Sequence, residues 1–379
     1  MRIAIFSDNF YPEISGISDS IILTSKELAK RGNEITIYVP RYVRRNYQKV
    51  NLPEKEIDLG ENIRIIRLPS IPFRTGTGQG RAAVPLGFSL KSIWKSRPDV
   101  IHVHLPFGAG LEGLMASMLF GIPLVGTEHT FMKGVIGSRF VRKIVVSYNS
   151  WFFRKCKFLS SPAKFMLSDD CSQKKDVIPN PIDLLSFKDS KQNREKHGLP
   201  GFAVLYCGGL ADYKHIDLVI KAIAKAKESV PDIKFAIVGI GAEEKSLRLL
   251  VRKLNLEKEV SFLGYIRGKE LSEIYKSCDV FATMSAAEVH SLAVMQAMAS
   301  AMPVIATNAN GLKECVNPGT GFLIEPGDID ELAGKIVFLC KNPEIKKKMG
   351  ENGLKFVENL SPSKIAKRWE EAYRAQKVV

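Results

Sequence analysis

Short apolar runs alternate with longer stretches of helical periodicity along most of the chain. In the first half, the spans Ser18–Gly32 and Leu111–Leu119 carry apolar residues at helical spacing, and Gly32 suits the end of its helix. Around them lie runs with the length and β-branched character of strands, at Ile3–Ser7, Glu34–Val39, Ile63–Leu68, Asp99–His104 and Pro123–Glu128. Strands that alternate with helices predict a parallel sheet built from βαβ units.

The same alternation restarts after residue 185. It predicts strands at Ala203–Cys207, Lys234–Val238, Val260–Leu263, Val280–Thr283 and Pro303–Ala306, with helices at Ile216–Ala226, Lys245–Lys253, Leu271–Lys276 and Leu292–Ala301. The polar segment Ser186–Pro200 separates the two series and is predicted to be a linker. We therefore expect an α/β fold of two doubly wound parallel-sheet domains, with ligands at the carboxyl ends of the strands.

Length and charge add to this picture. The 379 residues suit two domains, and 45% hydrophobic content can bury a sizeable core in each. The net charge is +15: residues 1–185 hold 26 Lys and Arg against 16 Asp and Glu, and the remaining residues hold 29 against 24. Such a bias favours an anionic partner, which composition leaves open as nucleic acid, an acidic lipid surface or a phosphorylated substrate.

The cellular location follows from what the sequence lacks. The six cysteines form no CxxC pair and indicate single buried thiols in a reducing compartment. The first residues read as a strand and not as a signal peptide, and no apolar run reaches the length of a membrane span. We expect a cytoplasmic protein, or one bound peripherally to the inner face of the membrane.

The strongest local signal is the segment from Ser285 to Ala306. It reads as a strand end, a polar loop with Glu288, an apolar helix that starts near Ser291, and a further strand. Free N–H groups at that helix start suit a phosphate, and Gln296 can point back toward the same site. Simple helix capping would explain Ser291, but it would not explain the carboxylate of Glu288 in the loop.

Glycine-rich turns follow other strands. The turn Gly208–Lys214 combines glycines with a lysine, which suits phosphate, although it lacks the spacing of a phosphate-binding loop. Gly239 and Gly241 form half of a dinucleotide fingerprint. Gly16, in the loop after the first strand, would let backbone approach a ligand closely, or would serve an ordinary turn.

Histidines mark two strand ends in the first half. His102 and His104 alternate along one strand and should face the same side, where packing is favoured over metal binding because no third ligand is evident nearby. His129 ends the next strand and is a candidate hydrogen-bonding partner for a reacting group. Taken alone, however, His129 is better explained by a structural role.

Residues 133–157 carry seven Lys and Arg and no acid. Within them Phe140, Ile144, Tyr148, Trp151 and Phe152 fall on one helical face. This combination favours a helix that lies on an anionic membrane surface, and the nearby basic residues around Arg44 strengthen that interpretation. The alternative is a helix that packs its apolar stripe on the domain core.

Together these segments resemble glycosyltransferase family 4, the retaining enzymes of the GT-B fold, over nearly the whole chain. The segments that carry the resemblance are Phe10-Tyr-Pro12 with Gly16, Asp99 to His104, Glu128-His129-Thr130, Val177 to Asp183, Gly208 to Lys214, and Glu288 to Gln296. The resemblance implies an acceptor-binding domain at 1–185 and a donor-binding domain at 197–358. It also implies that the last helix, at 359–379, returns to the first domain.

The resemblance also implies roles for single residues. Glu288 would bind hydroxyls of the donor sugar, Lys214 would neutralise the diphosphate, and His129 would act beside the transferred sugar. Catalytic residues would thus be His129 and Glu288. The donor-binding set would be Gly16, Gly209, Lys214, Gly239, Gly241, Glu288, His290, the backbone N–H groups of Ser291 and Leu292, and Gln296 at the ribose.

Two positions depart from the family pattern. Gly209 stands where an arginine usually clamps the diphosphate, and Gln296 replaces the second glutamate. A charged hydrogen bond to phosphate contributes about 1.5–3 kcal/mol, so the loss at Gly209 is the larger one. His215 and His290 are further candidates for a cation near the phosphates.

No metal or other cofactor is expected. Asp328-Ile-Asp330 matches the DxD motif with which another glycosyltransferase architecture holds metal and diphosphate, but Asp328 follows Pro326-Gly327 and precedes a helix, which favours capping.

The sequence therefore predicts a retaining hexosyltransferase that uses a nucleoside diphosphate sugar. Because the first half is most similar to enzymes that glycosylate diacylglycerol or phosphoinositol lipids, a membrane lipid or lipid-linked acceptor is preferred. The main alternative is a catalytically silent GT-B protein that binds a nucleotide sugar or partners an active enzyme. Nucleic acid is not expected as a partner, because no binding motif accompanies the high pI.

Overall fold

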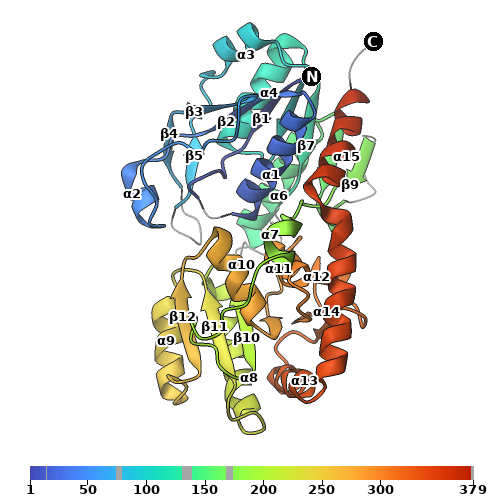
Figure 1. The fold of residues 1–379 in the computed structure, drawn as a ribbon. Helices are drawn as coiled ribbons and strands as arrows, with labels where there is room; N and C mark the ends of the chain where they lie inside the picture. Colours follow the sequence, from blue (N-terminus) through green and yellow to red (C-terminus); the bar gives the residue numbers. More distant parts are fainter. Residues whose placement is uncertain (14, 74–78, 130–138, 168–173, 377–379) are drawn as a thin grey trace. The chain divides into compact units, whose positions relative to one another are not determined.

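The computed structural model describes residues 1–13, 15–73, 79–129, 139–167 and 174–376. These form two compact units (Figure 1). The first comprises Met1–Pro181 together with Pro362–Val379, and the second comprises Ile182–Ser361. Each unit is a parallel sheet between helices, which is the α/β architecture of two doubly wound domains that the sequence predicts.

The first unit is built on a seven-stranded parallel sheet with the order β3-β2-β1-β6-β7-β8-β9. Its strands are β1 (Arg2–Phe6), β2 (Glu34–Pro40), β3 (Ile63–Leu68), β6 (Val100–Val103), β7 (Leu124–Thr127), β8 (Phe158–Ser161) and β9 (Lys174–Val177). A separate antiparallel pair is formed by β4 (Ser70–Pro72) and β5 (Arg81–Ala83). The strand order reverses between β1 and β6, where a doubly wound sheet leaves its ligand crevice.

Alternate side chains of β1 enter two different cores, which shows how the helices are divided between the faces. Ile3 and Ile5 pack with α1 (Gly16–Lys30) and α15 (Pro362–Arg374), and Ala4 and Phe6 pack with α3 (Leu90–Ser96), α4 (Gly108–Phe120) and α6 (Arg139–Phe153). The short helices α2 (Arg44–Gln48) and η1 (Lys164–Met166) complete the unit.

The second unit repeats this plan with a six-stranded parallel sheet of order β12-β11-β10-β13-β14-β15. The strands are β10 (Ala203–Cys207), β11 (Lys234–Val238), β12 (Val260–Gly264), β13 (Val280–Thr283), β14 (Val304–Thr307) and β15 (Gly321–Ile324). Here the order reverses between β10 and β13.

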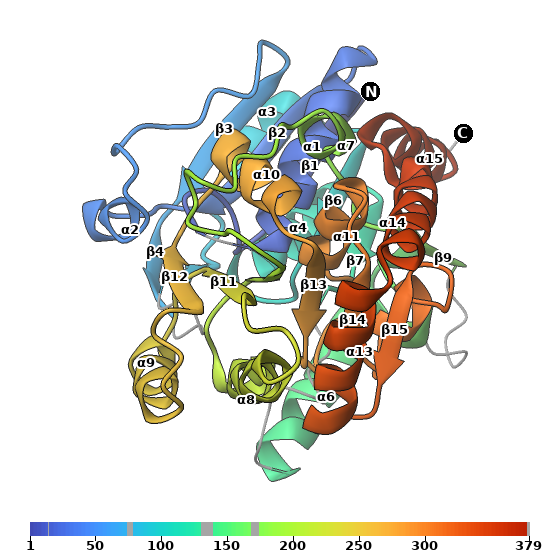
Figure 2. The same cartoon turned by 60° about the horizontal axis from the view of Figure 1, so that its bottom comes forward.

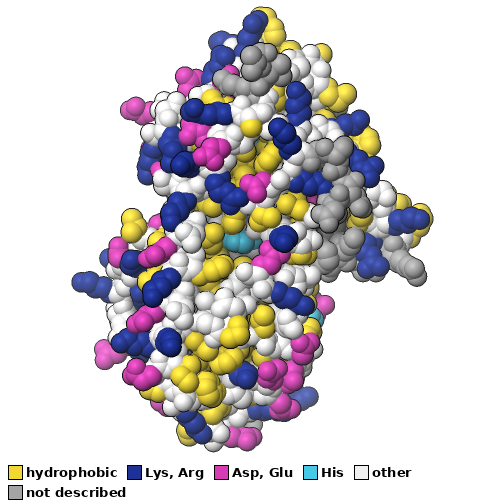
Figure 3. All heavy atoms as spheres, turned by 90° about the vertical axis from the view of Figure 1, so that its right-hand side faces the viewer, with side chains coloured by type: hydrophobic (Ala, Val, Ile, Leu, Met, Phe, Trp, Pro, Cys, Tyr) yellow, Lys and Arg dark blue, Asp and Glu magenta, His cyan; other side chains and the backbone are white. Residues whose placement is uncertain are grey.

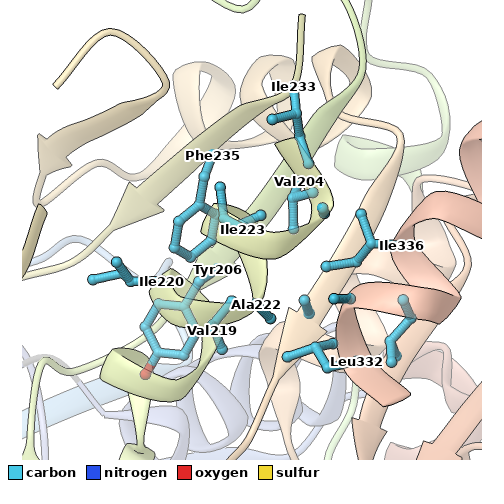
Figure 4. Close-up of a cluster of buried hydrophobic side chains, with 14 of the residues drawn as sticks. Val204, Tyr206, Val219, Ile220, Ala222, Ile223, Ile233, Phe235, Leu332 and Ile336 are labelled. Atoms are coloured by element: carbon cyan, nitrogen blue, oxygen red, sulfur yellow. The ribbon is translucent and has the colours of Figure 1, made fainter. Parts of the chain in front are cut away.

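Helices cover both faces of this sheet. One core joins Val204, Tyr206 and Phe235 to α8 (Ile216–Lys227), α9 (Glu244–Lys253) and α13 (Ile329–Lys341), and Figure 4 shows these side chains packed together. Figure 2 shows α8 and α13 side by side under the sheet, where they contact each other directly. The opposite core joins α7 (Leu184–Lys188), α10 (Gly268–Ser277), α11 (Leu292–Ala299), α12 (Leu312–Cys315) and α14 (Pro343–Val357). Two short 3₁₀ turns are η2 (Asp212–Lys214) and η3 (Glu358–Leu360).

One sequence-based expectation needs correction, and one expected helix can now be given its bounds. The polar segment 186–200 is not an unpacked linker, because Phe187 and Leu199 are buried in a core of the second unit. The helix expected within 133–157 is α6, which ends at Phe153, and residues 133–138 lie outside the described residues. Gly32 does follow the end of α1 with φ +81°, the left-handed conformation for which glycine is suited.

The helix α15 belongs to the first unit although it comes last in the sequence. Ile365, Trp369 and Tyr373 lie in the core that α1 also lines, and the ring of Trp369 lies 4.5 Å from that of His102. The end of the chain therefore supports the strand that carries the histidines.

Trp369→Ala should lower the free energy of unfolding of the first unit by about 3–5 kcal/mol, because it empties a well-packed site. The matched control is Trp94→Ala on α3, since the exposed fraction is 5% for Trp369 and 62% for Trp94. Urea denaturation followed by circular dichroism measures both variants. Equal stabilities of the two variants would contradict the packing role of α15.

Candidate active site

The best candidate site in the second unit lies where β10 and β13 end. These strands are hydrogen-bonded neighbours, so the loops that leave their carboxyl ends start close together. The loop after β10 leads through η2 to Lys214, and the loop after β13 carries Glu288 to the start of α11. Two residues that are 74 positions apart are thereby brought to one place.

Lys214 and Glu288 form an ion pair between Nζ and Oε1, and each side chain is 17% exposed. The Lys214 Nζ also lies 5.1 Å from the ring centre of Tyr213. Burial alone would lower the pKa of Lys214, but the neighbouring Glu288 carboxylate outweighs that effect and the pKa lies above its usual value. The lysine is therefore a permanent cation at neutral pH.

The loop that carries Glu288 is held by residues that sequence reasoning missed. The Gly311 N–H donates to the Glu288 carbonyl oxygen at 3.1 Å, and the Asn310 side-chain amide donates to the Ala286 carbonyl. A Cβ on Gly311 would lie 1.6 Å from the carbonyl oxygen of Val289, so only glycine permits this approach. The Asn-Gly pair after β14 is a turn signal that could have drawn attention to this segment.

The start of α11 gives the site its free N–H groups. Ser291 is the N-cap residue, but its side chain makes no capping hydrogen bond, so the capping interpretation does not explain it. Leu292 is the first helical residue. Gln296 lies on the same helix, and its Oε1 accepts a hydrogen bond from the Tyr275 hydroxyl of α10 at 3.0 Å. The Gln296 oxygen therefore already has one partner, and its NH₂ group supplies the remaining donors.

Gly239 and Gly241 lie where two loops approach each other closely. A Cβ on Gly239 would lie 1.9 Å from the Gly208 carbonyl oxygen, and one on Gly241 would lie 2.2 Å from that of Leu210. These glycines let the loops after β10 and β11 pack backbone against backbone. By contrast, a Cβ on Gly209 would meet no atom within 4 Å, so the position of the missing arginine opens onto free space.

His290 and His215 are close in sequence to Glu288 and Lys214, respectively. Burial lowers the pKa of His290 to about 4, so this ring is neutral at neutral pH and is not the additional cation considered above. Its buried Nδ1 finds no hydrogen-bond partner among the residues that the structure describes. His215 follows Lys214 with φ +50°, a left-handed conformation that is uncommon for residues other than glycine.

Three histidines meet at the carboxyl edge of the first sheet. His104 Nδ1 lies 2.8 Å from His129 Nε2, and His102 makes 2.7 Å hydrogen bonds to the hydroxyls of Thr127 and Tyr373. Burial lowers the pKa of His102 to about 3 and that of His104 well below its usual value, so both rings stay neutral. The contact with His104 fixes the orientation of the His129 ring, and both histidines line one small cavity with Asn180.

The remaining predicted residues fall as follows. Gly16 is the exposed first residue of α1, after Ser15 has capped that helix by accepting the Ile17 N–H. Asp328 caps α13 by accepting the Glu331 N–H at 2.8 Å, as the sequence predicts, and Asp330 pairs with Lys225. Within the described ranges, no group of three or more His, Cys, Asp or Glu is arranged to hold a metal ion.

Two family models together match most of the chain. The model described as Glycosyltransferase Family 4 matches residues 14–184, and the model described as Glycosyl transferases group 1 matches residues 188–356. Both fall on the units whose sheets and sites are described above. The chain belongs to glycosyltransferase family 4.

Known relatives of this glycosyltransferase agree with that assignment. Alpha-monoglucosyldiacylglycerol synthase from Streptococcus pneumoniae is 26% identical over 89% of this chain and 78% of its own. The enzyme of the same name from Acholeplasma laidlawii is 25% identical over 93% and 91%. The structure of Anabaena HepE in complex with UDP and glucose superposes with a TM-score of 0.78, at 20% identity over 99% of this chain and 100% of that one. The GT-B fold of the glycosyltransferase is thus established.

The basic helix α6 divides its apolar residues between core and solvent. Phe152 is buried in the first unit, whereas Phe140, Ile144 and Trp151 are exposed, so the predicted single stripe is split. The Lys155 Nζ lies 5.9 Å from the centre of the Trp151 ring. On the face drawn in Figure 3, lysine and arginine side chains mix with acidic and apolar ones. None of the described helices is both long and apolar enough to cross a bilayer.

Gly239→Ala should lower the free energy of unfolding by about 2 kcal/mol or more, because the new methyl group meets a backbone oxygen at a residue with φ +140°. Gly209→Ala is the matched control and should change stability by less than about 0.5 kcal/mol. Urea denaturation midpoints compare the two. A fully stable Gly239→Ala variant would mean that the two loops do not need this close approach.

Proposed function

We propose that this glycosyltransferase moves a hexose from a nucleoside diphosphate sugar to a membrane lipid, with retention of the anomeric configuration. The observation that carries the proposal is the Lys214–Glu288 pair beside the start of α11, at the reversal of strand order in the second unit. It places a cation, a carboxylate and free backbone N–H groups together, which are the three kinds of group that such a donor requires.

Donor binding would exchange the partners of this pair. The diphosphate would take the ammonium group of Lys214 and the N–H groups of Ser291 and Leu292, where the helix dipole favours negative charge. The sugar hydroxyls would donate to the Glu288 carboxylate. The side chains of Lys214 and Glu288 are already half-buried and held by their ion pair. Little side-chain entropy would therefore be lost when the donor replaces each as the partner of the other.

Catalysis in this proposal is orientation and charge stabilisation. As the bond to the sugar breaks, negative charge grows on the departing diphosphate and strengthens its attraction to Lys214. His129, oriented by His104, would hydrogen-bond to the transferred sugar or to the acceptor.

A lipid acceptor is supported by the relatives and by α6. Two relatives that align along most of the chain are named as synthases of a glucosyldiacylglycerol. Phe140, Ile144 and Trp151 are exposed on a helix that also carries Arg142 and Lys143 and is followed directly by Arg154 and Lys155. Exposed aromatic and basic side chains on one helix suit an anionic bilayer surface and would bring the enzyme to its acceptor.

Calorimetry on the purified chain tests the donor site. The ligands are the diphosphates of uridine, guanosine, adenosine, cytidine and thymidine. Wild type should bind one of these nucleoside diphosphates, and Lys214→Ala should weaken that binding about tenfold or more, as expected for a lost charged hydrogen bond. Gly209→Arg should bind equally well or more tightly, because the position is open. A wild type that binds none, together with a Gly209→Arg variant that does, would instead identify a catalytically silent protein.

The Glu288→Gln variant separates nucleoside diphosphate binding, measured by the same calorimetry, from sugar transfer. This change removes the carboxylate that neutralises Lys214, so nucleoside diphosphate affinity should stay the same or rise while sugar transfer falls nearly to zero. Transfer is followed with lipid acceptor in vesicles, and the anomeric configuration of the product is read by nuclear magnetic resonance. Wild-type turnover by Glu288→Gln would refute the assigned sugar contact, and an inverted product would refute retention.

Transfer should also continue in excess EDTA. In this proposal Lys214 supplies the positive charge at the phosphates, while Asp328 and Asp330 serve as a helix cap and a partner of Lys225. Initial rates with and without chelator measure the effect. Loss of activity that manganese or magnesium restores would place a metal ion in the reaction.

A further inference from the structure

The outward sides of α3 and α4 expose large apolar side chains that neither the fold nor the donor site uses. The two helices lie next to each other in the first unit (Figure 1). The exposed fraction is 73% for Leu86, 72% for Met118 and 64% for Leu119. We call the whole set the α3–α4 surface: Leu86, Phe88, Trp94, Met115, Met118 and Leu119. Several large apolar side chains exposed on neighbouring helices indicate an interaction site more strongly than a single exposed residue does.

This surface is held in place by a buried carboxylate. Glu112, on α4, is fully buried and accepts hydrogen bonds from the backbone N–H groups of Gly87, Phe88 and Ser89 at 2.6, 3.1 and 2.9 Å. It thereby fixes the turn before α3, where Gly87 has φ +82°. Leu86 and Phe88, on either side of that glycine, are presented to solvent by a rigid turn and not by a loose loop.

The charge around the α3–α4 surface has one sign. Lys91 and Lys95 are exposed on α3 on the same side as Trp94, and Arg97 is exposed at the end of that helix. Residues 84–97 and 108–122, all of them described, contain one acidic residue, the buried Glu112. The exposed surface of these segments is therefore apolar and cationic.

The α3–α4 surface also lies on the same side of the sheet as α6. All three helices pack on one core through Ile93, Leu114 and Phe152. The exposed side chains of α6 and those of the α3–α4 surface therefore belong to the outer side of one helical layer.

We propose that the α3–α4 surface is a docking site for an anionic lipid bilayer. Leu86, Phe88, Met118 and Leu119 would enter the boundary between headgroups and acyl chains, Trp94 would lie at the interface, and the three cations would meet anionic headgroups. A second copy of the chain is disfavoured as the occupant because the cations of the two copies would face each other. The inference deepens the proposed lipid acceptor, but its test does not depend on sugar transfer.

Tryptophan fluorescence separates this surface from α6. The chain has three tryptophans, Trp94, Trp151 and the buried Trp369. Trp151→Phe leaves Trp94 as the exposed reporter, and Trp94→Phe leaves Trp151. With vesicles of equal parts phosphatidylglycerol and phosphatidylcholine whose acyl chains are brominated, the Trp151→Phe protein should be quenched. Vesicles of phosphatidylcholine alone should quench it much less, and added salt should reduce the quenching.

Substitutions test the contribution to binding. Met118→Ser with Leu119→Ser should weaken sedimentation with the phosphatidylglycerol vesicles by about tenfold or more, because two large apolar side chains no longer leave water. Lys91→Gln with Lys95→Gln should weaken it and reduce its salt dependence. The matched controls are Leu249→Ser and Arg252→Gln with Lys253→Gln on α9, whose residues are likewise exposed, and they should bind as wild type does.

The alternatives give different results. Binding with quenched Trp151 and unquenched Trp94 would overturn the proposal and assign the membrane contact to α6 alone. Absence of vesicle binding would overturn it as well. So would self-association in analytical ultracentrifugation that the Met118→Ser with Leu119→Ser protein loses, since a second copy would then cover the surface. Nucleoside diphosphate affinity should be unchanged in all these variants, so a failed donor site would be recognised separately.

Discussion

The parallel pairing of β10 with β13 is the constraint on which the donor site depends. Because the strand order reverses there, the chain leaves the two strands toward opposite faces of the sheet, and their loops diverge over a shared space. Lys214 and Glu288 reach each other across that space. The close backbone contacts of Gly239 with Gly208 and of Gly311 with Val289 then hold in place the loops that carry Lys214 and Glu288. The site is therefore a consequence of sheet topology, secured by positions at which only glycine fits.

The first unit uses burial in a comparable way. His102 lies on β6 and His104 directly follows its end, and their buried rings lie 4.1 Å apart where protonation is strongly disfavoured. Tyr373 of α15 and Thr127 of β7 satisfy both nitrogens of His102. This arrangement leaves His104 to orient His129, so the position of a candidate catalytic side chain is linked to the packing of the last helix. An imidazole oriented in this way suits hydrogen bonding to a sugar.

Much of this could be predicted from the sequence, and the failures have physical causes. Strongly apolar strands such as Val280–Thr283 and Ala203–Cys207 were placed to the residue, because burial on both faces produces a continuous apolar run. The strand Phe158–Ser161 was missed because half of it is serine, although Ser160 and Ser161 are fully buried. The edge strand β9 is mostly charged and gives no hydrophobic signal. Glu288 was found because a carboxylate at a strand end has no packing role. Its pairing with Lys214 requires the strand order, which no local pattern contains.

The balance of charge in the donor site limits how the enzyme can hold its substrate. In the proposed donor site, Lys214 would contribute one positive charge and the start of α11 about half of one, while Glu288 would keep its negative charge after it turned to the sugar hydroxyls. A diphosphate carries at least two negative charges into this site. The neutral His290 adds none, and Gly209 leaves the usual arginine position empty of charge. If the donor binds as proposed, these residues would neutralise its phosphates less fully than the family pattern does. It follows that contacts with the nucleoside and the sugar must supply a larger share of donor affinity. Glu288, as a charged acceptor for hydroxyls, then matters for binding the intact donor and not only for orienting it.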